Sequence, residues 1–415
     1  MQSVNPVLPE RGFAVERLLP PRQAVIAFLS RVNVAPPSVE RVPFDEALGR
    51  VLAEPILADD DYPAAPRSAM DGFAVRCEAT PGTFEIAGDV AMGAAPARTI
   101  EGSAAWRIPT GGVLPAGADA VVPIEDARVT GSGFTIGAPL IAGENVVERG
   151  ADMRRGEIVI GARRRIRAAE IGVLAALGVT SVPVYRRPTI AVFSSGDELV
   201  DPKRRPEPGE VRDSNRHAVA ASLRAMGALP RHYPTLRDEA EEFESSLVAA
   251  LDECDAVVVT GGSSVGERDR LPHAVANVAE PGVIVHGLRV KPGKPTLLGA
   301  RGNKPILGLP GNPTSALLVL EAVASPIVAA LVGAPFTPAT LRAKLAEPAR
   351  SRGDWTWYVP VSLRDDGELP LARPLPLRSF SVSLTARADG YIVMDERDEA
   401  WPAGTIVTVH RYIGA

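Results

Sequence analysis

The sequence predicts a multidomain protein of the α/β plus β class, with a three-layer α/β domain, an inserted small β domain and a C-terminal β-barrel. Three observations support this prediction. Strands and helices alternate regularly over residues 188–333, helical periodicity is absent from about 58 to 151, and strands without helices follow Pro335. With 415 residues, of which 46% are hydrophobic and 23% charged, the chain is long enough to bury a core in each of several domains.

Two helices flank the region without helical periodicity. The first is predicted over residues 19–34, where prolines stand near its start and apolar residues follow at helical spacing. The second covers 168–177, ends at Gly178 and is followed by an apolar strand over 179–185. We expect the two helices to rejoin in one discontinuous domain, 15–57 plus 152–186, with the β domain 58–151 inserted into it.

The remaining domains follow from the same periodicities. The inserted β domain contains short β-rich pieces at 84–87, 104–108, 119–124 and 134–137. The α/β domain, 187–334, has predicted strands at 189–194, 228–233, 255–260, 282–290, 295–299 and 305–309, and predicted helices at 214–227, 238–254, 270–279 and 313–332. The last domain, 335–415, contains "WTWYVPVSL", "GYIVM" and "TIVTVHRY" and is predicted to be a β-barrel or a sandwich.

Charge and composition exclude several classes of function. The net charge of -5 gives no global positive field that would hold nucleic acid or an anionic membrane. Two cysteines are too few for a disulfide framework, which favours a reducing compartment. The N-terminus lacks the features of a secretory signal, and the apolar run 316–334 is interrupted by Glu321 and Pro326, as in a buried helix. A cytoplasmic protein is the resulting expectation.

Three glycine-bearing loops follow predicted strands of the α/β domain. Ligands of such sheets bind beyond the carboxyl ends of the strands, and glycine pairs let backbone N–H groups approach an anion. The candidate phosphate-binding residues are Gly261, Gly262, Ser263 and Ser264 in one loop and Pro310, Gly311 and Asn312 in another. Ordinary helix capping by Asn312 is the alternative for the second loop. Neither loop is a Walker motif or a G-x-G-x-x-G fingerprint.

Acidic residues gather on the same predicted rim. Asp197 and Glu198 follow the first strand, and Asp238 stands at the head of a helix. Glu267 and Asp269 belong to the loop that begins with Gly261. Carboxylates beside phosphate-binding loops indicate Mg²⁺, which uses one or two carboxylates together with substrate phosphates. For Asp238 alone, a helix N-cap is the alternative.

Lys291 and Lys294 frame a Pro-Gly turn in "VKPGKPT". Only five of the 45 lysines and arginines of the chain are lysines, so two lysines in one short turn are informative. An ammonium group is not interchangeable with a guanidinium at a tight anion site, and the turn is therefore a candidate anion site. The alternative is a solvated turn with incidental charge.

Three other segments have ordinary local interpretations. Asp71-Gly72 in "RSAMDGFAV" reads as a hairpin turn, and Thr110-Gly111-Gly112 is similarly ambiguous. Residues 163–167 contain four arginines and read as a solvated turn and helix entry. The histidines show no metal-ligand spacing, and no Ser-His-Asp arrangement is recognisable.

Seven of these motifs occur together and in order. They are "SAMDGFAV", "PTGGVLP", "SSGDELV", "DSNRHAV", "TGGSSVGERD", "VKPGKP" and "LPGNPTSAL". This set resembles the molybdopterin molybdenumtransferase family, of the MoeA type related to the gephyrin E domain, over residues 15–410. The resemblance implies a Rossmann-like, molybdopterin-binding α/β domain and a homodimer, with each cleft formed by the α/β domain of one subunit and the β domain of the other.

The family resemblance also implies an activity. Adenylyl-molybdopterin and molybdate are the implied substrates, the phosphoanhydride is cleaved with Mg²⁺, and AMP and molybdenum cofactor are released. Further implied partners are the molybdopterin adenylyltransferase and recipient molybdoenzymes. The implied catalytic residues are Asp71, Thr110, Glu198, Lys291 and Lys294, and the implied metal ligands are Asp238 and Asp269. Asp213, Ser214, Asn215 and Ser383 join the glycine loops as implied substrate-binding residues.

The sequence departs from the family pattern at two places. "PAAPR" precedes Ser68 where an acid-amide pair is usual, and "RSFSVSLTARADGYIV" replaces a Gly-Ser-Gly stretch, with Ser383 as the matched serine. Two other functions compete with molybdenum insertion. A non-catalytic scaffold or carrier would have no chemical need for the retained carboxylates and lysines. The adenylyltransferase family lacks the inserted β domain and the C-terminal barrel.

Overall fold

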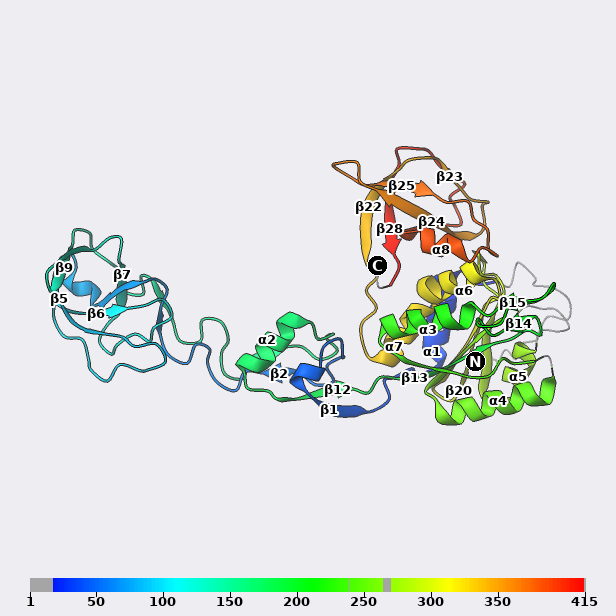
Figure 1. The fold of residues 1–415 in the computed structure, drawn as a ribbon, viewed down its shortest axis with the longest axis horizontal. Coiled ribbons are helices and arrows are strands. Elements are labelled where there is room, and N and C mark those ends of the chain that lie inside the picture. Colours follow the sequence, from blue (N-terminus) through cyan, green and yellow to red (C-terminus); the bar gives the residue numbers. More distant parts are fainter. Residues whose placement is uncertain (1–17, 238, 264–269, 414–415) are drawn as a thin grey trace. The chain divides into compact units, whose positions relative to one another are not determined.

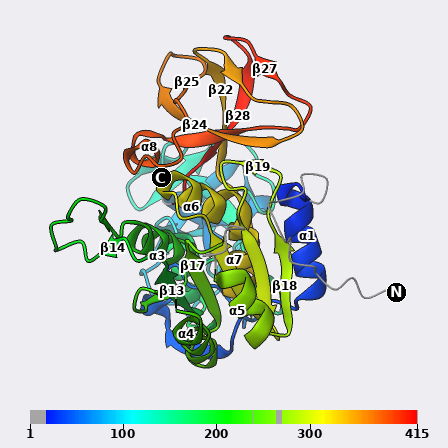
Figure 2. The same ribbon diagram turned by 90° about the vertical axis from the view of Figure 1, so that its right-hand side faces the viewer.

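The computed structural model describes residues 18–237, 239–263 and 270–413 (Figures 1 and 2). The chain forms two compact units. The main unit consists of the described residues up to Ala53, of Arg163–Ile171 and of the chain from Thr180 onward. The inserted unit consists of Glu54–Ala162 and Gly172–Val179.

A six-stranded sheet forms the centre of the main unit. Its strand order is β16-β13-β17-β21-β20-β18. The first four strands run parallel, whereas β20 and β18 are antiparallel to their neighbours. The bounds are β13 Thr189–Ser194, β16 Leu229–His232, β17 Ala256–Thr260, β18 Pro281–His286, β20 Leu297–Arg301 and β21 Lys304–Leu309. This arrangement confirms the predicted α/β class.

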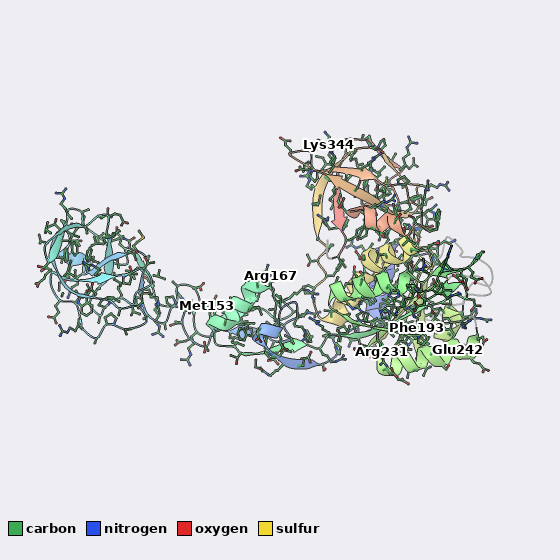
Figure 3. All side chains as sticks on the ribbon, viewed as in Figure 1. Met153, Arg167, Phe193, Arg231, Glu242 and Lys344 are labelled. Carbon is green, nitrogen blue, oxygen red and sulfur yellow. The ribbon has the colours of Figure 1, made fainter. Side chains whose placement is uncertain are left out.

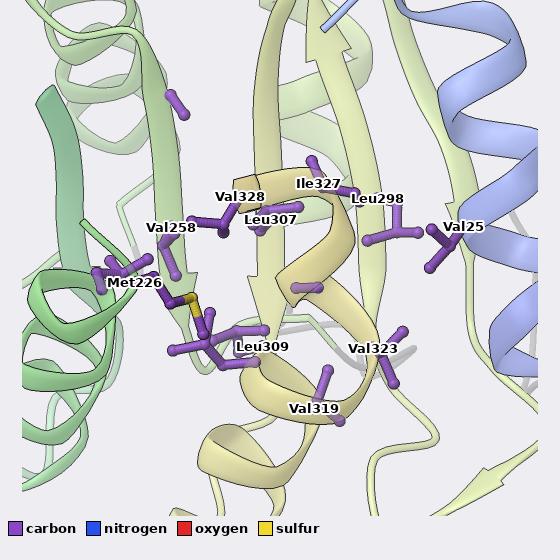
Figure 4. Packing of buried hydrophobic residues seen from close by; sticks show 14 of the residues in the cluster. Val25, Met226, Val258, Leu298, Leu307, Leu309, Val319, Val323, Ile327 and Val328 are labelled. Carbon is purple, nitrogen blue, oxygen red and sulfur yellow. The ribbon is translucent and has the colours of Figure 1, made fainter. Parts of the chain in front are cut away.

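Helices cover both faces of the sheet. Val258 and Leu307 pack with α1, α3 and the final helix, as Figure 4 shows, whereas Val257 and Phe193 pack with α4 and α5 on the opposite face. Phe193 is fully buried and is labelled in Figure 3. Alternate residues of a strand point to opposite faces, so continuous apolar strands bury both faces and give three layers. The helices are α1 Pro21–Arg31, α3 Asn215–Met226, α4 Ala240–Glu253 and α5 Leu271–Val278.

One predicted strand, over 282–290, is divided in the structure. β18 ends at His286, and Gly287 then adopts a positive φ of 86°. The chain re-enters an extended conformation only at β19, Val290–Lys291, which pairs with a strand of another sheet. The prediction of one strand was wrong because apolar content cannot reveal a break at a single glycine.

The final helix of the α/β part spans Pro313–Val332 in three segments. They are α6 Pro313–Val319, the π-helical turn η4 Leu320–Ala324 and α7 Ser325–Val332. Its length and composition would permit a membrane span, but 72% of its apolar window is buried inside the protein. The helix is therefore core, as the interruptions at Glu321 and Pro326 predict.

The C-terminal strands close into a β-barrel. β24 pairs with both β25 and β26, so the order β24-β25-β22-β28-β26 returns to β24. The bounds are β22 Thr340–Leu345, β24 Thr356–Arg364, β25 Leu371–Pro374, β26 Gly390–Met394 and β28 Ile406–Arg411, with a separate pair β23 Ala349–Arg350 and β27 Ala400–Trp401, and helix α8 Ser383–Arg387. The barrel was predicted as one of two alternatives and is confirmed.

The inserted unit is built on a second six-stranded sheet, in the order β7-β4-β6-β5-β9-β8. The rings of Phe73 and Phe134 stack with centroids 4.3 Å apart, and Phe84 stacks on Phe134 at 5.1 Å. The strands of this sheet are β4 Gly72–Val75, β5 Gly82–Asp89, β6 Ala104–Ile108, β7 Ala120–Pro123, β8 Arg128–Thr130 and β9 Gly133–Ile136. Two short two-stranded pairs accompany it: β2 Ile56–Leu57 pairs with β11 Ile158–Ile160, and β3 Arg67–Ser68 pairs with β10 Val146–Val147. A 3₁₀ turn, η3, covers Cys77–Ala79.

The N-terminal helix packs differently from the expectation. α1 lies against β18, η4 and α7 and adds Phe28 to the core of the α/β part. It therefore belongs to the main unit, whereas α2, Ala168–Ala176, lies in a segment divided between the two units. The remaining elements are β1 Val39–Pro43 paired with β12 Ser181–Tyr185, the turn η2 Phe44–Glu46, and β14 Leu199–Val200 paired with β15 Val211–Arg212. The predicted division into four domains stays a prediction.

Candidate functional site

The loops that follow β13, β17 and β21 meet at one edge of the main sheet. These three strands are parallel neighbours, so their carboxyl ends lie together. A cavity of about 890 Å³ opens between these loops, the turn after β19 and the C-terminal barrel. Nine predicted site residues line it: Glu198, Gly261, Gly262, Ser263, Lys291, Lys294, Pro310, Gly311 and Asn312.

The glycine loops come close to each other by backbone alone. Gly261 and Gly262 have φ values of 87° and 62°, which side chains rarely adopt. A Cβ at Gly261 would lie 2.6 Å from the carbonyl oxygen of Ser195, and one at Gly311 would lie 3.5 Å from the Cα of Gly261. Among the described residues, none accepts a hydrogen bond from the N–H of Gly262 or Gly311. With respect to the described residues, these N–H groups are candidates to donate hydrogen bonds to an anion in the cavity.

The lysine turn joins the α/β part to the barrel. Lys291 pairs in register with Trp357 of β24, and its Nζ lies 4.9 Å from the centre of the Trp357 ring. Gly293 has a φ of 118°, and a Cβ there would lie 2.3 Å from Cγ2 of Val319. Thr296 donates a hydrogen bond of 2.6 Å to the Gly293 carbonyl. Both lysines are therefore held at the cavity by a turn that only glycine fits.

Glu198 adds a carboxylate to the lining of the cavity. Gly196 has a φ of 143°, and a Cβ there would lie 2.5 Å from Oε2 of Glu198. The Glu198 side chain thus occupies the space that a residue larger than glycine at position 196 would take. The Glu198 carbonyl accepts a hydrogen bond from Val211, which anchors this loop on β15. Among the described lining residues, the cavity therefore has the ammonium groups of Lys291 and Lys294, the guanidinium of Arg352 and the carboxylate of Glu198 beside the glycine loops.

Asp213 supports the cavity without lining it. Its side chain is 2% exposed and accepts a hydrogen bond of 2.9 Å from Ser194. The Ser194 hydroxyl also lies 3.1 Å from that of Thr260, and Nε of Arg216 lies 3.0 Å from Asp213 Oδ2. This buried network links the ends of β13 and β17 to the start of α3.

Ser214 and Asn215 also stand behind the cavity wall. Ser214 is the N-cap residue of α3, and the Asn215 side chain donates a hydrogen bond of 2.7 Å to the Gly311 carbonyl. Asn215 thus orients the second glycine loop. Like Asp213, these two predicted substrate-binding residues do not line the cavity.

Asp71 and Thr110 form a pair within the inserted unit. Thr110 donates two hydrogen bonds to the same Asp71 oxygen, one from its backbone N–H at 2.6 Å and one from its hydroxyl at 2.8 Å. These hydrogen bonds lower the pKa of Asp71. Asp71-Gly72 is not a hairpin turn, because β3 pairs with β10 whereas β4 pairs with β6 and β7. A Cβ at Gly72 would lie 1.9 Å from the Val122 carbonyl oxygen, so close strand packing requires this glycine.

The remaining predicted residues are Ser383 and three that the structure does not describe. Ser383 is the exposed first residue of α8 and does not line it, although Leu377 and Ser379 of the preceding segment do. Ser264, Asp238 and Asp269 lie outside the described residues. Within the described ranges, no group of three or more histidine, cysteine or acidic side chains is arranged to hold a metal ion.

The residues on the barrel side of the cavity were not predicted from the sequence. They are Arg352, Trp355, Trp357, Leu377 and Ser379. The sequence does contain a pattern that points to these tryptophans. Two of the four tryptophans of the chain stand two residues apart in "WTW", and alternate residues of a strand share a face, so both rings are expected on one side of the strand. The two indole rings add aromatic surface to a cavity that also has glycine loops and lysines, which suits a ligand with both rings and phosphates.

Three family profiles match successive segments of the chain, and all three describe proteins of molybdopterin biosynthesis or molybdopterin binding. Residues 19–178 match the family profile described as the MoeA N-terminal region (domain I and II). Residues 191–330 match a probable molybdopterin binding domain, and residues 342–412 match the MoeA C-terminal region (domain IV).

Individual relatives cover most of the chain. The molybdopterin molybdenumtransferase of Staphylococcus epidermidis is 32% identical over 375 residues, which cover 88% of this chain and 89% of the relative. That of Bacillus subtilis is 30% identical over 384 residues, which cover 89% of each. The crystal structure of the molybdopterin biosynthesis MoeA protein from Pyrococcus horikoshii superposes with a TM-score of 0.80 at 30% identity, over 96% of this chain and 100% of that one.

The matched profiles and relatives define the class as multidomain transferases whose α/β domain is a probable molybdopterin binding domain. The chain belongs to the MoeA family, the molybdopterin molybdenumtransferases of molybdenum cofactor biosynthesis.

Proposed function

We propose that this protein inserts molybdenum into adenylylated molybdopterin, cleaving the phosphoanhydride and releasing AMP and molybdenum cofactor. One observation carries the proposal: Lys291 and Lys294 line the same cavity as the two glycine loops. Two ammonium groups beside backbone N–H donors suit a substrate pair that consists of a phosphoanhydride and the molybdate dianion.

The glycine loops bind the phosphate groups in this proposal. The N–H groups of Gly262 and Gly311 point to no described protein acceptor, so a phosphate oxygen supplies the missing partner. Asn215 donates a hydrogen bond to the Gly311 carbonyl and so keeps this oxygen directed away from the bound phosphate. The rings of Trp355 and Trp357 pack against a ring system of the ligand.

The lysines stabilise negative charge during the reaction. Cleavage of the phosphoanhydride adds the elements of water across one P–O–P bond and leaves additional charge on the two phosphates. Fixed cations near those oxygens favour this transition state without reorganisation. No covalent nucleophile is needed, because positioning and charge neutralisation dominate phosphoryl transfer. Lys291 and Lys294 also attract molybdate to the side of the cavity that the barrel covers.

Mg²⁺ is the proposed cofactor. Glu198 is a single carboxylate beside the proposed phosphate site, and Mg²⁺ is usually held by one or two carboxylates with substrate phosphates, so the described donors fit this ion. Asp238 and Asp269 are the other proposed ligands. Bound Mg²⁺ would neutralise phosphate charge, while Glu198 itself orients the attacking oxygen.

We also propose a homodimer in which Asp71 and Thr110 of one copy complete the cavity of the other. The Asp71–Thr110 pair lies in the inserted unit and carries a carboxylate whose charged form is stabilised by two hydrogen bonds. Mixing an inactive Asp71→Ala protein with an inactive Lys294→Ala protein tests this arrangement. Recovery of activity on mixing supports a shared site, and a stable monomer in sedimentation contradicts it. The adenylyltransferase and recipient molybdoenzymes are proposed as partners only by family resemblance, and the proposed cytoplasmic location rests on the composition and N-terminal sequence.

The direct test is AMP release from adenylyl-molybdopterin with Mg²⁺, in the presence and absence of molybdate. Molybdate-dependent release, reduced about a hundredfold in Lys294→Ala, is the expected result. Lys344→Ala is a matched control, because Lys344 is an exposed lysine of β22 outside the cavity. Tight substrate binding without AMP release, even with molybdate, would identify a scaffold or carrier and contradict the proposal.

A further inference from the structure

The main unit contains a second cavity, of about 510 Å³, that shares no lining residue with the first. It is bounded by residues 163–167, by the segment 334–339 that follows α7, and by β26 and β28 of the barrel. Its volume lies within the range of pockets that bind small organic molecules. The mechanism proposed above uses none of its residues.

A buried carboxylate forms the inner wall of this second cavity. Glu321 lies in the π-helical turn η4 and is 6% exposed. It accepts hydrogen bonds from the Ser222 hydroxyl at 2.8 Å and from the Ile413 N–H at 2.9 Å, while burial raises its pKa. π-Helical turns interrupt helices often at functional sites, and a buried acid requires a reason for its retention.

Two tyrosine rings stand beside Glu321. Tyr391 and Tyr412 both line the cavity, and their ring centroids lie 5.8 Å apart. The Tyr412 hydroxyl is buried and, within the described part of the chain, has no hydrogen-bond partner. Buried hydroxyls are normally paired, so this group is a candidate to contact a polar atom of a ligand. The inner part of the cavity thus combines aromatic surface with two polar groups.

Five arginines form another part of the wall. They are Arg163, Arg164, Arg165, Arg167 and Arg411, and Glu321 is the only acidic residue among the described lining side chains. Arg165 is fixed by hydrogen bonds to the carbonyls of Gly49 and Met226, at 2.9 and 2.8 Å. Nε of Arg411 is buried without a partner in the described ranges. Arg164 and Arg167 are ion-paired with Glu170, so Arg163, Arg165 and Arg411 supply the excess of positive charge around the cavity, and this excess favours an anion.

We propose that this cavity binds a small aromatic anion, with its acidic group at the arginines and its ring between Tyr391 and the apolar lining residues Ala334 and Phe336. A polar group at the inner end of the ring would contact the Tyr412 hydroxyl and Glu321. The arginines of residues 163–167, which resemble a solvated turn in the sequence, thus become one wall of a binding site. This inference does not depend on the proposed molybdenum insertion, because the two cavities are separate.

Fluorescence titration of the full chain tests the proposal with 6-hydroxy-2-naphthoate as the probe and neutral 6-hydroxy-2-naphthamide as its uncharged match. We expect saturable binding of one naphthoate per chain and binding of the naphthamide weaker by about tenfold. Equal affinity for the two probes, or no saturable binding, would overturn the proposal.

Two pairs of variants locate the probe. Ala329 lines the cavity and Ala330 follows it on the same helix without lining it, so Ala329→Phe should abolish binding and Ala330→Phe should preserve it. Arg411→Gln should weaken binding about tenfold, whereas Arg342→Gln, on the exposed side of β22, should not. Lys294→Ala, in the first cavity, should leave naphthoate binding unchanged. Equal effects within either pair, or loss of binding in Lys294→Ala, would place the probe elsewhere and contradict the proposal.

Discussion

Lys291 and Trp357 are register partners in adjacent strands, and the Lys291 ammonium lies 4.9 Å from the centre of the Trp357 ring. A cation over an indole face is attracted by the ring quadrupole and is held in one position. Through this pair, the barrel determines where a cation of the α/β part stands in the cavity. The finding assigns Trp357 a positioning role that its apolar character alone would not suggest.

Replacing Trp357 should therefore affect molybdate use more than protein stability. We expect Trp357→Leu to raise the KM for molybdate about fivefold, because about 1 kcal/mol of cation–π attraction is lost. Trp357→Phe should give a smaller increase. Steady-state AMP release at varied molybdate concentrations measures both. Trp401→Phe, in β27, is the control, and an equal effect there would argue against the positioning role.

Gly293→Ala should disrupt the lysine turn. The new Cβ would lie 2.3 Å from Val319, and the φ of 118° is strained for alanine. We expect AMP release to fall by at least about tenfold, because a small displacement of catalytic groups is costly.

The matched control for this change is Gly302→Ala. Gly302 has a φ of 61° but open space around it, so this variant isolates backbone strain from collision. It should lose about 1 kcal/mol of stability and retain activity. Similar losses of activity in the two variants would show that collision with Val319 is not the cause.

The pH dependence of activity should respond to Thr110. Its backbone and side-chain hydrogen bonds lower the pKa of Asp71, so the charged form persists to lower pH than for an ordinary aspartate. Thr110→Val removes the hydroxyl donor, raises this pKa and should shift the acid limb of the AMP-release profile to higher pH. Thr110→Ser keeps the hydroxyl and should keep the wild-type profile. A ¹³C carboxyl titration of Asp71 that is identical in all three proteins would contradict this explanation.

Acid stability should depend on Glu170. Hydrogen bonds from Arg167 lower the pKa of this buried carboxyl to about 2. Burial acts in the opposite direction, and a hydrogen bond from Arg164 lowers the pKa further. Because the folded pKa is depressed, its contribution to stability is complete above the unfolded value and is lost as pH falls toward 2.

Glu170→Gln should accordingly lower the free energy of unfolding by about 1.5 kcal/mol at pH 7. The difference from wild type should shrink as the pH is lowered from about 4.5 toward 2. Urea unfolding at several pH values measures it, with Glu101→Gln at an exposed position as control. A difference that does not change with pH would exclude the ion pair as its source.

Much of the fold was predictable because its signals are local. Helix ends at Gly178 and Gly227, the apolar strands of the main sheet and the alternating strands of the barrel all follow from short-range patterns. The division of the predicted strand 282–290 and the packing of α1 on β18 were missed. Both depend on hydrogen bonds and contacts with segments that are distant in the sequence.

The sequence by itself determined the order of the elements, the glycine loops and the lysine turn, since each is specified by residue types within a few positions. Only the tertiary structure decided which side chains share a cavity. Strand register brought Trp357 to Lys291, and the meeting of three segments enclosed Glu321 with the arginines. The physical reason is that periodicity specifies which face of an element is buried, whereas the partner of that face is selected by packing and hydrogen bonding across the whole chain.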